Sequence, residues 1–251
     1  MIRKKRHWQL DKLFYPADRP MAALPCWEHH VHSEYSDGTS PVAEIIARAL
    51  AQGIERLILT EHTEPELVAG PGWFVAYVRT VRELRAAVRD ELTVLIGLEV
   101  PILDMSGHLL INDAMLAQAE FILGAVHAYP GHGWNLDTIE PARAIDLEYR
   151  ALLALTRHPD VDAIAHPGGV CTKYVTPFPM ELFDEVVRQA AANGKAIELN
   201  PAYHEPLLPY LEICRKHGAL ISPGSNAHRP EEMGLAWEEL KKLQVGRRGD
   251  G

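Results

Sequence analysis

Residues 27–38 read Trp27-Glu28-His29-His30-Val31-His32-Ser33-Glu34-Tyr35-Ser36-Asp37-Gly38, in which two histidines two positions apart precede an acidic turn. Alternate side chains of a strand point to the same face. A strand here would hold the imidazoles of His30 and His32 side by side at its end, with His29 facing the opposite side. Neutral imidazole is a common ligand for zinc and similar ions. A pair of surface histidines would explain this stretch equally well, so its meaning depends on the rest of the chain.

Outward from this stretch, short apolar runs alternate with amphipathic stretches about seven times. Leu57-Ile58-Leu59 is typical of a buried parallel strand, and the apolar residues of 42–49 recur at helical spacing. The predicted strands are 28–32, 55–60, 93–99, 121–127, 161–165, 196–200 and 219–223. The predicted helices are 41–52, 72–90, 112–118, 141–157, 180–193, 207–217 and 231–243. This alternation predicts an α/β fold whose parallel strands close into a barrel.

Composition is that of one globular domain. The chain has 251 residues, of which 47% are hydrophobic, and a formal net charge of −9. We expect an N-terminal extension over 1–24, a barrel over 25–244 and a flexible tail over 245–251. No apolar run is long enough for a membrane span, and none follows the basic start as a secretory signal would require. The negative charge disfavours a broad nucleic-acid surface, although it does not exclude a nuclease whose metal ions supply positive charge.

The chain has three cysteines, which are Cys26, Cys171 and Cys214. An odd number at wide spacing does not indicate a disulfide framework. We therefore expect the protein in a reducing compartment, the cytoplasm.

Each predicted strand ends in side chains that can bind metal. In a parallel barrel the carboxyl ends of all strands meet on one face, so we expect these side chains to lie together. They are His30, His32, His62, Glu99, His127, His166, Asn226 and His228, with Asp37 in the turn after the first strand. A zinc ion usually takes about four ligands, so this number predicts two or three ions. Two ions roughly 3.5–4 Å apart are a recurrent device for hydrolysing phosphoesters.

At this point the chain resembles the PHP (polymerase and histidinol phosphatase) superfamily of metal-dependent phosphoesterases. The resemblance covers residues 27 to about 235. It rests on His30-Val31-His32 with Ser36-Asp37-Gly38, Thr60-Glu61-His62, Glu99, His127, His166-Pro167-Gly168 and Ser225-Asn226-Ala227-His228-Arg229-Pro230. The family implies a distorted (β/α)7 barrel with two or three divalent ions, such as Zn, Mn or Fe.

The resemblance also implies a ligand set for each ion. The first ion would be held by His30, His32, Glu99 and Asn226. The second would share Glu99 and add His127 and His166. The third would be held by Asp37, His62 and His228.

Asn226 departs from the pattern, because family members usually have aspartate there. An amide oxygen can still bind a cation, but the site loses one negative charge and a carboxylate that could accept a proton. Three explanations stay open: a natural variant that still works, a degenerate enzyme, or an introduced substitution that traps ligand. We expect a metal site that is intact or nearly so, because the other ligands are present.

The expected reaction is the attack of a metal-activated hydroxide on the phosphorus of a small phosphate monoester. Glu99, His228 and Arg229 are the candidate catalytic residues. Arg229 and Lys173 are candidate phosphate contacts, and His132 is a further candidate substrate contact. A free-standing chain of this length resembles the histidinol-phosphatase type.

Two other classes remain open. One is a nuclease or nucleotide phosphodiesterase. The other is a non-catalytic metal-binding or ligand-sensing protein, which Asn226 would allow. An amidohydrolase also begins with His-x-His, but the glutamate at 99 and the asparagine at 226 argue against that class. The sequence does not determine the oligomeric state.

Overall fold

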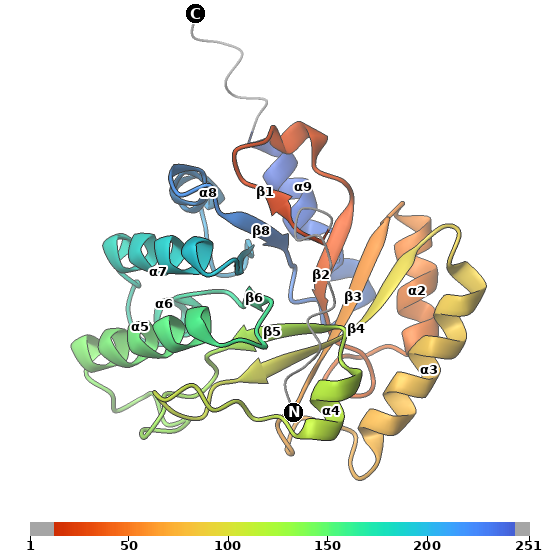
Figure 1. The fold of residues 1–251 in the computed structure, drawn as a ribbon, viewed down its shortest axis with the longest axis horizontal. Coiled ribbons are helices and arrows are strands. Elements are labelled where there is room, and N and C mark those ends of the chain that lie inside the picture. The colour runs from red at the N-terminus through yellow and green to blue at the C-terminus, as the bar shows by residue number, and fades with distance from the viewer. Residues whose placement is uncertain (1–12, 244–251) are drawn as a thin grey trace, which may run out of the picture.

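The computed structural model describes residues 13–243, so the tail at 245–251 and the basic start lie outside the described residues. The described residues form one eight-stranded sheet in the order β1-β8-β7-β6-β5-β4-β3-β2 (Figure 1). The parallel strands are β2 Trp27–Val31, β3 Arg56–His62, β4 Thr93–Pro101, β5 Phe121–Ala125, β6 Ala163–Ile164, β7 Ala196–Leu199 and β8 Leu220–Pro223. β1, Tyr15–Pro16, pairs antiparallel with β8.

The sheet curls until its first parallel strand meets the segment after the last one. Val31 and Ala227 form an isolated parallel bridge. The amide of His32 donates to Ala227 O at 2.9 Å, and the amide of Ala227 donates to His30 O at 3.0 Å. These bonds close the barrel, which confirms the predicted distorted (β/α)7 architecture.

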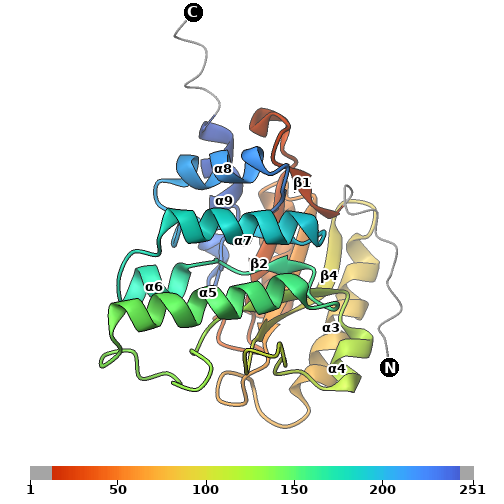
Figure 2. The same cartoon turned by 60° about the vertical axis from the view of Figure 1, so that its left-hand side comes forward.

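Helices cover the outside of the sheet. They are α2 Val42–Ala51, α3 Trp73–Val88, α4 Asp113–Gln118, α5 Pro141–Arg157, α6 Gly169–Tyr174, α7 Met180–Ala192, α8 Leu207–Lys216 and α9 Leu235–Lys242, with short 3-10 turns η1 Met21–Ala23 and η2 Pro230–Glu232. Helices α5, α7 and α8 lie one above another along one side (Figure 2). In α2 the predicted apolar stripe is the buried one, with Val42, Ile45, Ile46 and Ala49 facing the core. No helix within residues 13–243 is both long and apolar enough to cross a membrane.

The interior of the barrel is a packed core. It is filled by apolar side chains from successive strands, namely Ile58, Leu95, Phe121, Leu123, Ala125, Ala163, Ala165 and Ala196. Leu13 and Phe14 belong to the same cluster and are almost fully buried. The described part of the predicted N-terminal extension thus packs into the barrel through Leu13 and Phe14, whereas Tyr15, Met21 and Leu24 belong to the apolar cluster that includes the helices.

Strand β2 carries a bulge that changes which face its histidines occupy. Glu28 pairs with Leu57 and Val31 with Leu59, so His29 and His30 together lie opposite Ile58. The extra residue reverses the alternation of side chains. The ring of His29 therefore lies in the barrel interior, 6.2 Å from the ring of Phe121. The prediction that His29 faces the side opposite His30 is wrong for this reason.

Candidate metal centre

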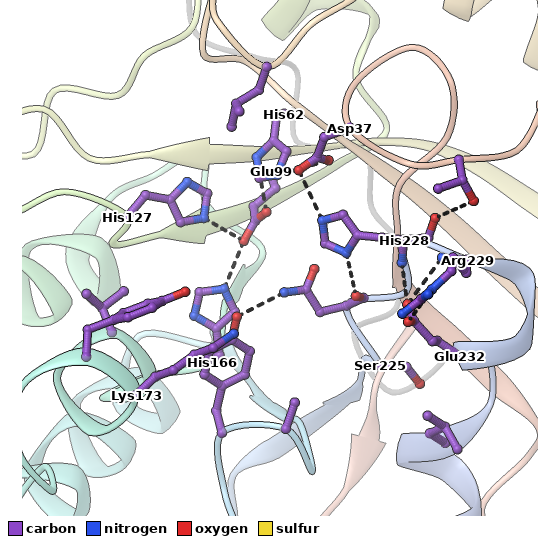
Figure 3. Close-up of a pocket in the computed structure, with 18 of the residues that line it drawn as sticks. Asp37, His62, Glu99, His127, His166, Lys173, Ser225, His228, Arg229 and Glu232 are labelled. Carbon is purple, nitrogen blue, oxygen red and sulfur yellow. Dashed lines mark hydrogen bonds and ion pairs between the residues drawn. The ribbon is translucent and has the colours of Figure 1, made fainter. Parts of the chain in front are cut away.

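Glu99, near the carboxyl end of β4, lies at the centre of the strand-end cluster and is almost fully buried (Figure 3). Its Oε1 is 3.0 Å from Nε2 of His127 and 3.1 Å from Nε2 of His166. Its Oε2 is 3.2 Å from Nε2 of His30 and 3.5 Å from Nε2 of His32. One carboxylate thus faces two pairs of imidazoles on opposite oxygens, as a ligand shared by two ions would.

A second group lies beside it, around Asp37 in the turn after β2. His62 Nε2 is 3.5 Å from Asp37 Oδ1, and His228 Nε2 is 3.2 Å from Asp37 Oδ2. The ring of His32 stacks between them, with its centroid 4.3 Å from that of His62 and 4.5 Å from that of His228. The structure therefore brings together the three residues predicted for the third ion.

The donor atoms form groups of the size that holds a cation. Within each group all ligand atoms lie within 4.8 Å of one another, and the groups are His30 with His32 and Glu99, Glu99 with His127 and His166, His62 with Glu64 and His127, and His32 with Asp37, His62 and His228. His30 Nε2 and His32 Nε2 are only 3.0 Å apart, and His62 Nδ1 is buried without a hydrogen-bond partner. Ring nitrogens and carboxylate oxygens gathered at such spacing fit two or three divalent ions.

Asn226 joins the first of these groups through its amide oxygen. Its Oδ1 is 3.1 Å from His32 Nε2, and its Nδ2 donates to the hydroxyl of Tyr203 at 3.2 Å. The backbone φ of Asn226 is +52°, a left-handed conformation that asparagine and aspartate tolerate better than most residues. His166 also has a positive φ, +22°. Backbone strain of this kind concentrates at functional sites.

Two buried carboxylates hold the outer nitrogens of the ligand histidines. Glu198 Oε1 is 2.7 Å from Nδ1 of His30, and its Oε2 accepts the backbone amide of His166 at 2.6 Å. Glu64 Oε1 is 2.5 Å from Nδ1 of His127. Such partners fix the orientation of a metal-binding imidazole. Glu64 is not among the predicted site residues, although an acidic residue two positions after a predicted ligand was a usable signal.

Two further buried glutamates hold the loops that carry ligands. Glu61 accepts hydrogen bonds from the hydroxyls of Ser33 at 2.6 Å and Ser36 at 2.5 Å, which fixes the turn leading to Asp37. Glu28 accepts from the amide and hydroxyl of Ser225 at 2.9 and 2.5 Å, next to Asn226. These bonds explain why a serine precedes each of the two ligand segments.

The charges of the cluster are strongly coupled. Burial opposes protonation of His30, but the carboxylates of Glu198 and Glu99 outweigh it and raise its pKa to about 10. Burial likewise opposes protonation of His127, and Glu99 and Glu64 raise its pKa to about 10. Burial would raise the pKa of Glu99, yet the surrounding imidazoles hold it well below its usual range. Positive charge nearby thus stabilises the buried carboxylates, and bound cations can supply that charge in place of protons on the histidines.

A cavity of about 780 Å³ opens above this cluster. Of the predicted substrate contacts, Arg229 and Lys173 line it, whereas His132 does not. His132 Nε2 lies 2.7 Å from the backbone carbonyl oxygen of Asn135. Arg229 donates from Nε to Glu232 Oε1 at 3.0 Å, which fixes the guanidinium at the rim (Figure 3).

Part of the cavity wall is aromatic and aliphatic. Leu67, Trp134, Val170, Tyr174, Tyr203 and Leu235 contribute to it. Lys173 lies on the same wall, with Nζ 5.1 Å from the ring centre of Tyr203 and 5.4 Å from that of Tyr174. The cavity therefore joins a polar, ion-binding floor to a wall suited to an apolar or aromatic group.

A barrel whose strand ends gather histidines and carboxylates under an open cavity defines a metal-dependent hydrolase. The model of the PHP domain family matches residues 28–202 of this chain. The chain belongs to the PHP family, which confirms the predicted membership.

Curated relatives cover most of the chain. A probable phosphatase from Acetivibrio thermocellus is 31% identical over 224 residues, which are 86% of this chain and 84% of the relative. A probable phosphatase from Syntrophotalea carbinolica is 27% identical over 226 residues, 86% of this chain and 85% of the relative. The DNA polymerase/3'-5' exonuclease PolX of Bacillus subtilis is 26% identical over 206 residues, 80% of this chain but 34% of PolX.

Solved structures share the fold. The histidinol phosphate phosphatase of Lactococcus lactis, complexed with zinc, L-histidinol and phosphate, superposes with a TM-score of 0.64 at 20% identity and covers 86% of this chain and 92% of its own. A candidate histidinol phosphatase from Listeria monocytogenes has a TM-score of 0.68 at 13% identity and covers 84% of this chain and 98% of its own. At these identities the likeness concerns the barrel.

Proposed function

We propose that this protein is a metal-dependent phosphatase that hydrolyses small phosphate monoesters. The observation that carries the proposal is the position of Glu99, which faces the rings of His30, His32, His127 and His166 beneath an open cavity. The curated relatives named as probable phosphatases support the same class.

Divalent ions held by these residues would supply a hydroxide nucleophile and neutralise charge on the phosphoryl group. The protein's own residues complete the reaction. Glu99 holds the two inner ligand sets at a fixed spacing. Arg229 and Lys173 place positive charge at the cavity, which favours the entry of a dianionic monoester. His228, which borders the cavity beside Asp37, would act through the third ion that it helps to hold.

The residues that line the cavity also indicate which alcohol part of the ester it can bind. Among its described lining residues the carboxylates are Asp37 and Glu99, which face ligand histidines, and Glu232, which is bonded to Arg229. None of the three is available to bind an ammonium group. Histidinol, which is bound in the Lactococcus lactis structure, carries such a group. We therefore propose that esters of aromatic or apolar alcohols are better substrates here than esters of amino alcohols.

A panel of phosphoesters tests both parts of this proposal. The protein would be loaded with Zn²⁺ or Mn²⁺, and kcat/KM measured for 1-naphthyl phosphate, histidinol phosphate, phosphoethanolamine, bis-p-nitrophenyl phosphate and a short oligonucleotide. We expect the naphthyl monoester to have the highest value. A preference for the diester or oligonucleotide would instead indicate a nuclease, as the match to PolX allows. A preference for the amino-alcohol esters would contradict only the leaving-group part.

We also propose that the protein works in the cytoplasm. Cys26, Cys171 and Cys214 are free and buried, which agrees with a reducing compartment. Fractionation of the source cells with an antibody to this chain would test the location.

A further inference from the structure

Tyr203 is a cavity residue whose contacts suggest a role that its sequence position alone does not indicate. It lies in the loop after β7 and lines the cavity above the metal centre. Its ring stacks on that of His166, with centroids 4.5 Å apart and planes at 28°. Its hydroxyl accepts a hydrogen bond from Nδ2 of Asn226 at 3.2 Å. The stacked ring and this hydrogen bond thus hold the hydroxyl in place, and the amide of Asn226 separates it from Nε2 of His32.

The amide of Asn226 determines the direction of that hydrogen bond. A side-chain amide has a carbonyl oxygen that accepts and an NH2 group that only donates. The oxygen faces His32 Nε2 at 3.1 Å, on the ion-binding side, and a cation there requires that orientation. The NH2 group must then face Tyr203. The phenolic oxygen is therefore the acceptor, and its own proton is free for another partner.

We propose that the hydroxyl of Tyr203 donates a hydrogen bond to a phosphoryl oxygen of the bound substrate, and that Asn226 makes this possible. This inference rests on the proposed phosphatase function. An aspartate at 226 would present a second oxygen to Tyr203, accept a hydrogen bond from its hydroxyl and so withdraw the donor from the substrate. Compared with aspartate, asparagine at this position removes a negative charge from the ion-binding site but leaves the Tyr203 hydroxyl free to donate to the phosphate.

The surroundings of Tyr203 agree with an anion-binding role. Nζ of Lys173 lies 5.1 Å from its ring centre, on the same wall of the cavity. The ring is held rigidly by His166, so little side-chain freedom is lost when the hydroxyl binds. Arg229, at the start of η2, lines the same cavity, so two positive side chains from different segments border it together with Tyr203.

Four proteins test the proposal: wild type, Tyr203→Phe, Asn226→Asp and the double variant. The first measurement is the Kd of inorganic phosphate for each metal-loaded protein, by titration calorimetry. We expect Tyr203→Phe to weaken phosphate binding about tenfold when residue 226 is asparagine, an effect within the reach of one hydrogen bond to a charged group. We expect less than a twofold effect when residue 226 is aspartate. Tyr149→Phe, on α5, is the matched control and should leave the Kd unchanged.

Elemental analysis of the same four samples separates the alternatives. An equal effect of Tyr203→Phe in both backgrounds, or no effect in either, would overturn the proposal. Loss of metal in Tyr203→Phe would also overturn it, because Tyr203 would then act by holding Asn226. If metal-loaded wild type hydrolyses no monoester, the phosphatase proposal fails, while the phosphate Kd values still report on Tyr203.

Discussion

Glu198 lies outside the groups of candidate ion ligands but contacts two of their members. One oxygen lies 2.7 Å from Nδ1 of His30 and the other accepts the amide of His166. Both partners donate, so both glutamate oxygens are needed as acceptors. Gly224 allows this packing, because a Cβ there would lie 2.8 Å from Cβ of His30 and would collide with Glu198.

Replacing Glu198 by glutamine should therefore weaken metal binding. Glutamine offers one acceptor and one NH2 group, and the NH2 would face a donor. Loss of such an orienting partner typically costs about 10–100-fold in metal affinity. Competition of the protein with a chromophoric chelator for Zn²⁺ would measure the change. The matched control is Glu239→Gln on α9, whose carboxylate pairs with Lys242 far from the cluster. Equal affinities of all three proteins would contradict the role.

Glu148 is a second buried carboxylate, outside the metal cluster. Its Oε2 accepts the hydroxyl of Tyr129 at 2.9 Å and the amide of Cys171 at 2.6 Å. It thereby joins the segment after His127 to helix α6, which follows His166. Burial raises the pKa of Glu148 to about 7 from the ordinary value of 4.5, even though these hydrogen bonds favour the ionised form.

This pKa predicts how stability depends on pH. Between pH 4.5 and about 7 the folded protein holds a proton on Glu148 that the unfolded chain has lost, so stability falls as pH rises through this window. The loss from this one group should approach ~3 kcal/mol. Urea unfolding of wild type and Glu148→Gln at several values from pH 5 to 8 would measure it. We expect wild type to lose stability relative to Glu148→Gln as pH rises. A difference independent of pH would contradict the assignment.

At the scale of elements, regular patterns were predictable and local exceptions were not. The stripe of α2 and the apolar run of β3 follow from side-chain periodicity, and the strand-end ligands follow from the parallel topology. Strand β1 has two residues and α6 has six, which is too short for a periodic signal. The predicted helix over 231–243 is divided into η2 and α9, where Gly234 adopts a φ of +83°.

The site was predictable to the same extent. Residues at strand ends could be placed together from topology alone. The bulge at His29 and His30 could not, because it depends on pairing with β3. Glu64 and Tyr203 lie beyond strand ends, and their contacts depend on how irregular loops pack. Periodicity carries no information there.

The N-terminal segment yields a prediction at this scale. Phe14 is fully buried in the barrel interior, with its ring 6.1 Å from that of Phe121. Phe14→Ala should lower the free energy of unfolding by about 3–5 kcal/mol, the usual cost of removing a core phenylalanine. Urea unfolding followed by circular dichroism would measure it. Leu208→Ala on α8, where the leucine is 40% exposed, should cost far less. A loss for Phe14→Ala as small as that for Leu208→Ala would show that the segment is not part of the core.

At the scale of the whole molecule, the barrel closes at the candidate metal centre. The bonds that join β2 to the segment after β8 involve His30, His32 and Ala227. The neighbouring side chains of His30, His32, Asn226 and His228 are the proposed ion ligands on the two sides of that seam. Bound ions would therefore cross-link the first and last parallel strands. Within the described residues the β pairing across this seam is one isolated bridge, whereas β3 and β4 pair over seven residues.

Removing the metal should therefore loosen the molecule at this seam first. A ligand that binds only the folded state adds about 4 kcal/mol of stability at 1,000 times its Kd, so chelation should lower the Tm. Hydrogen exchange followed by mass spectrometry would locate the effect in chelated and Zn²⁺-loaded protein. We expect the amides of His32 and Ala227 to exchange faster after chelation, while the amide of Leu98, in the middle of β4, changes little. Uniform acceleration would instead indicate that the ions stabilise the barrel as a single cooperative unit, and unchanged exchange at the seam would show that closure does not depend on them.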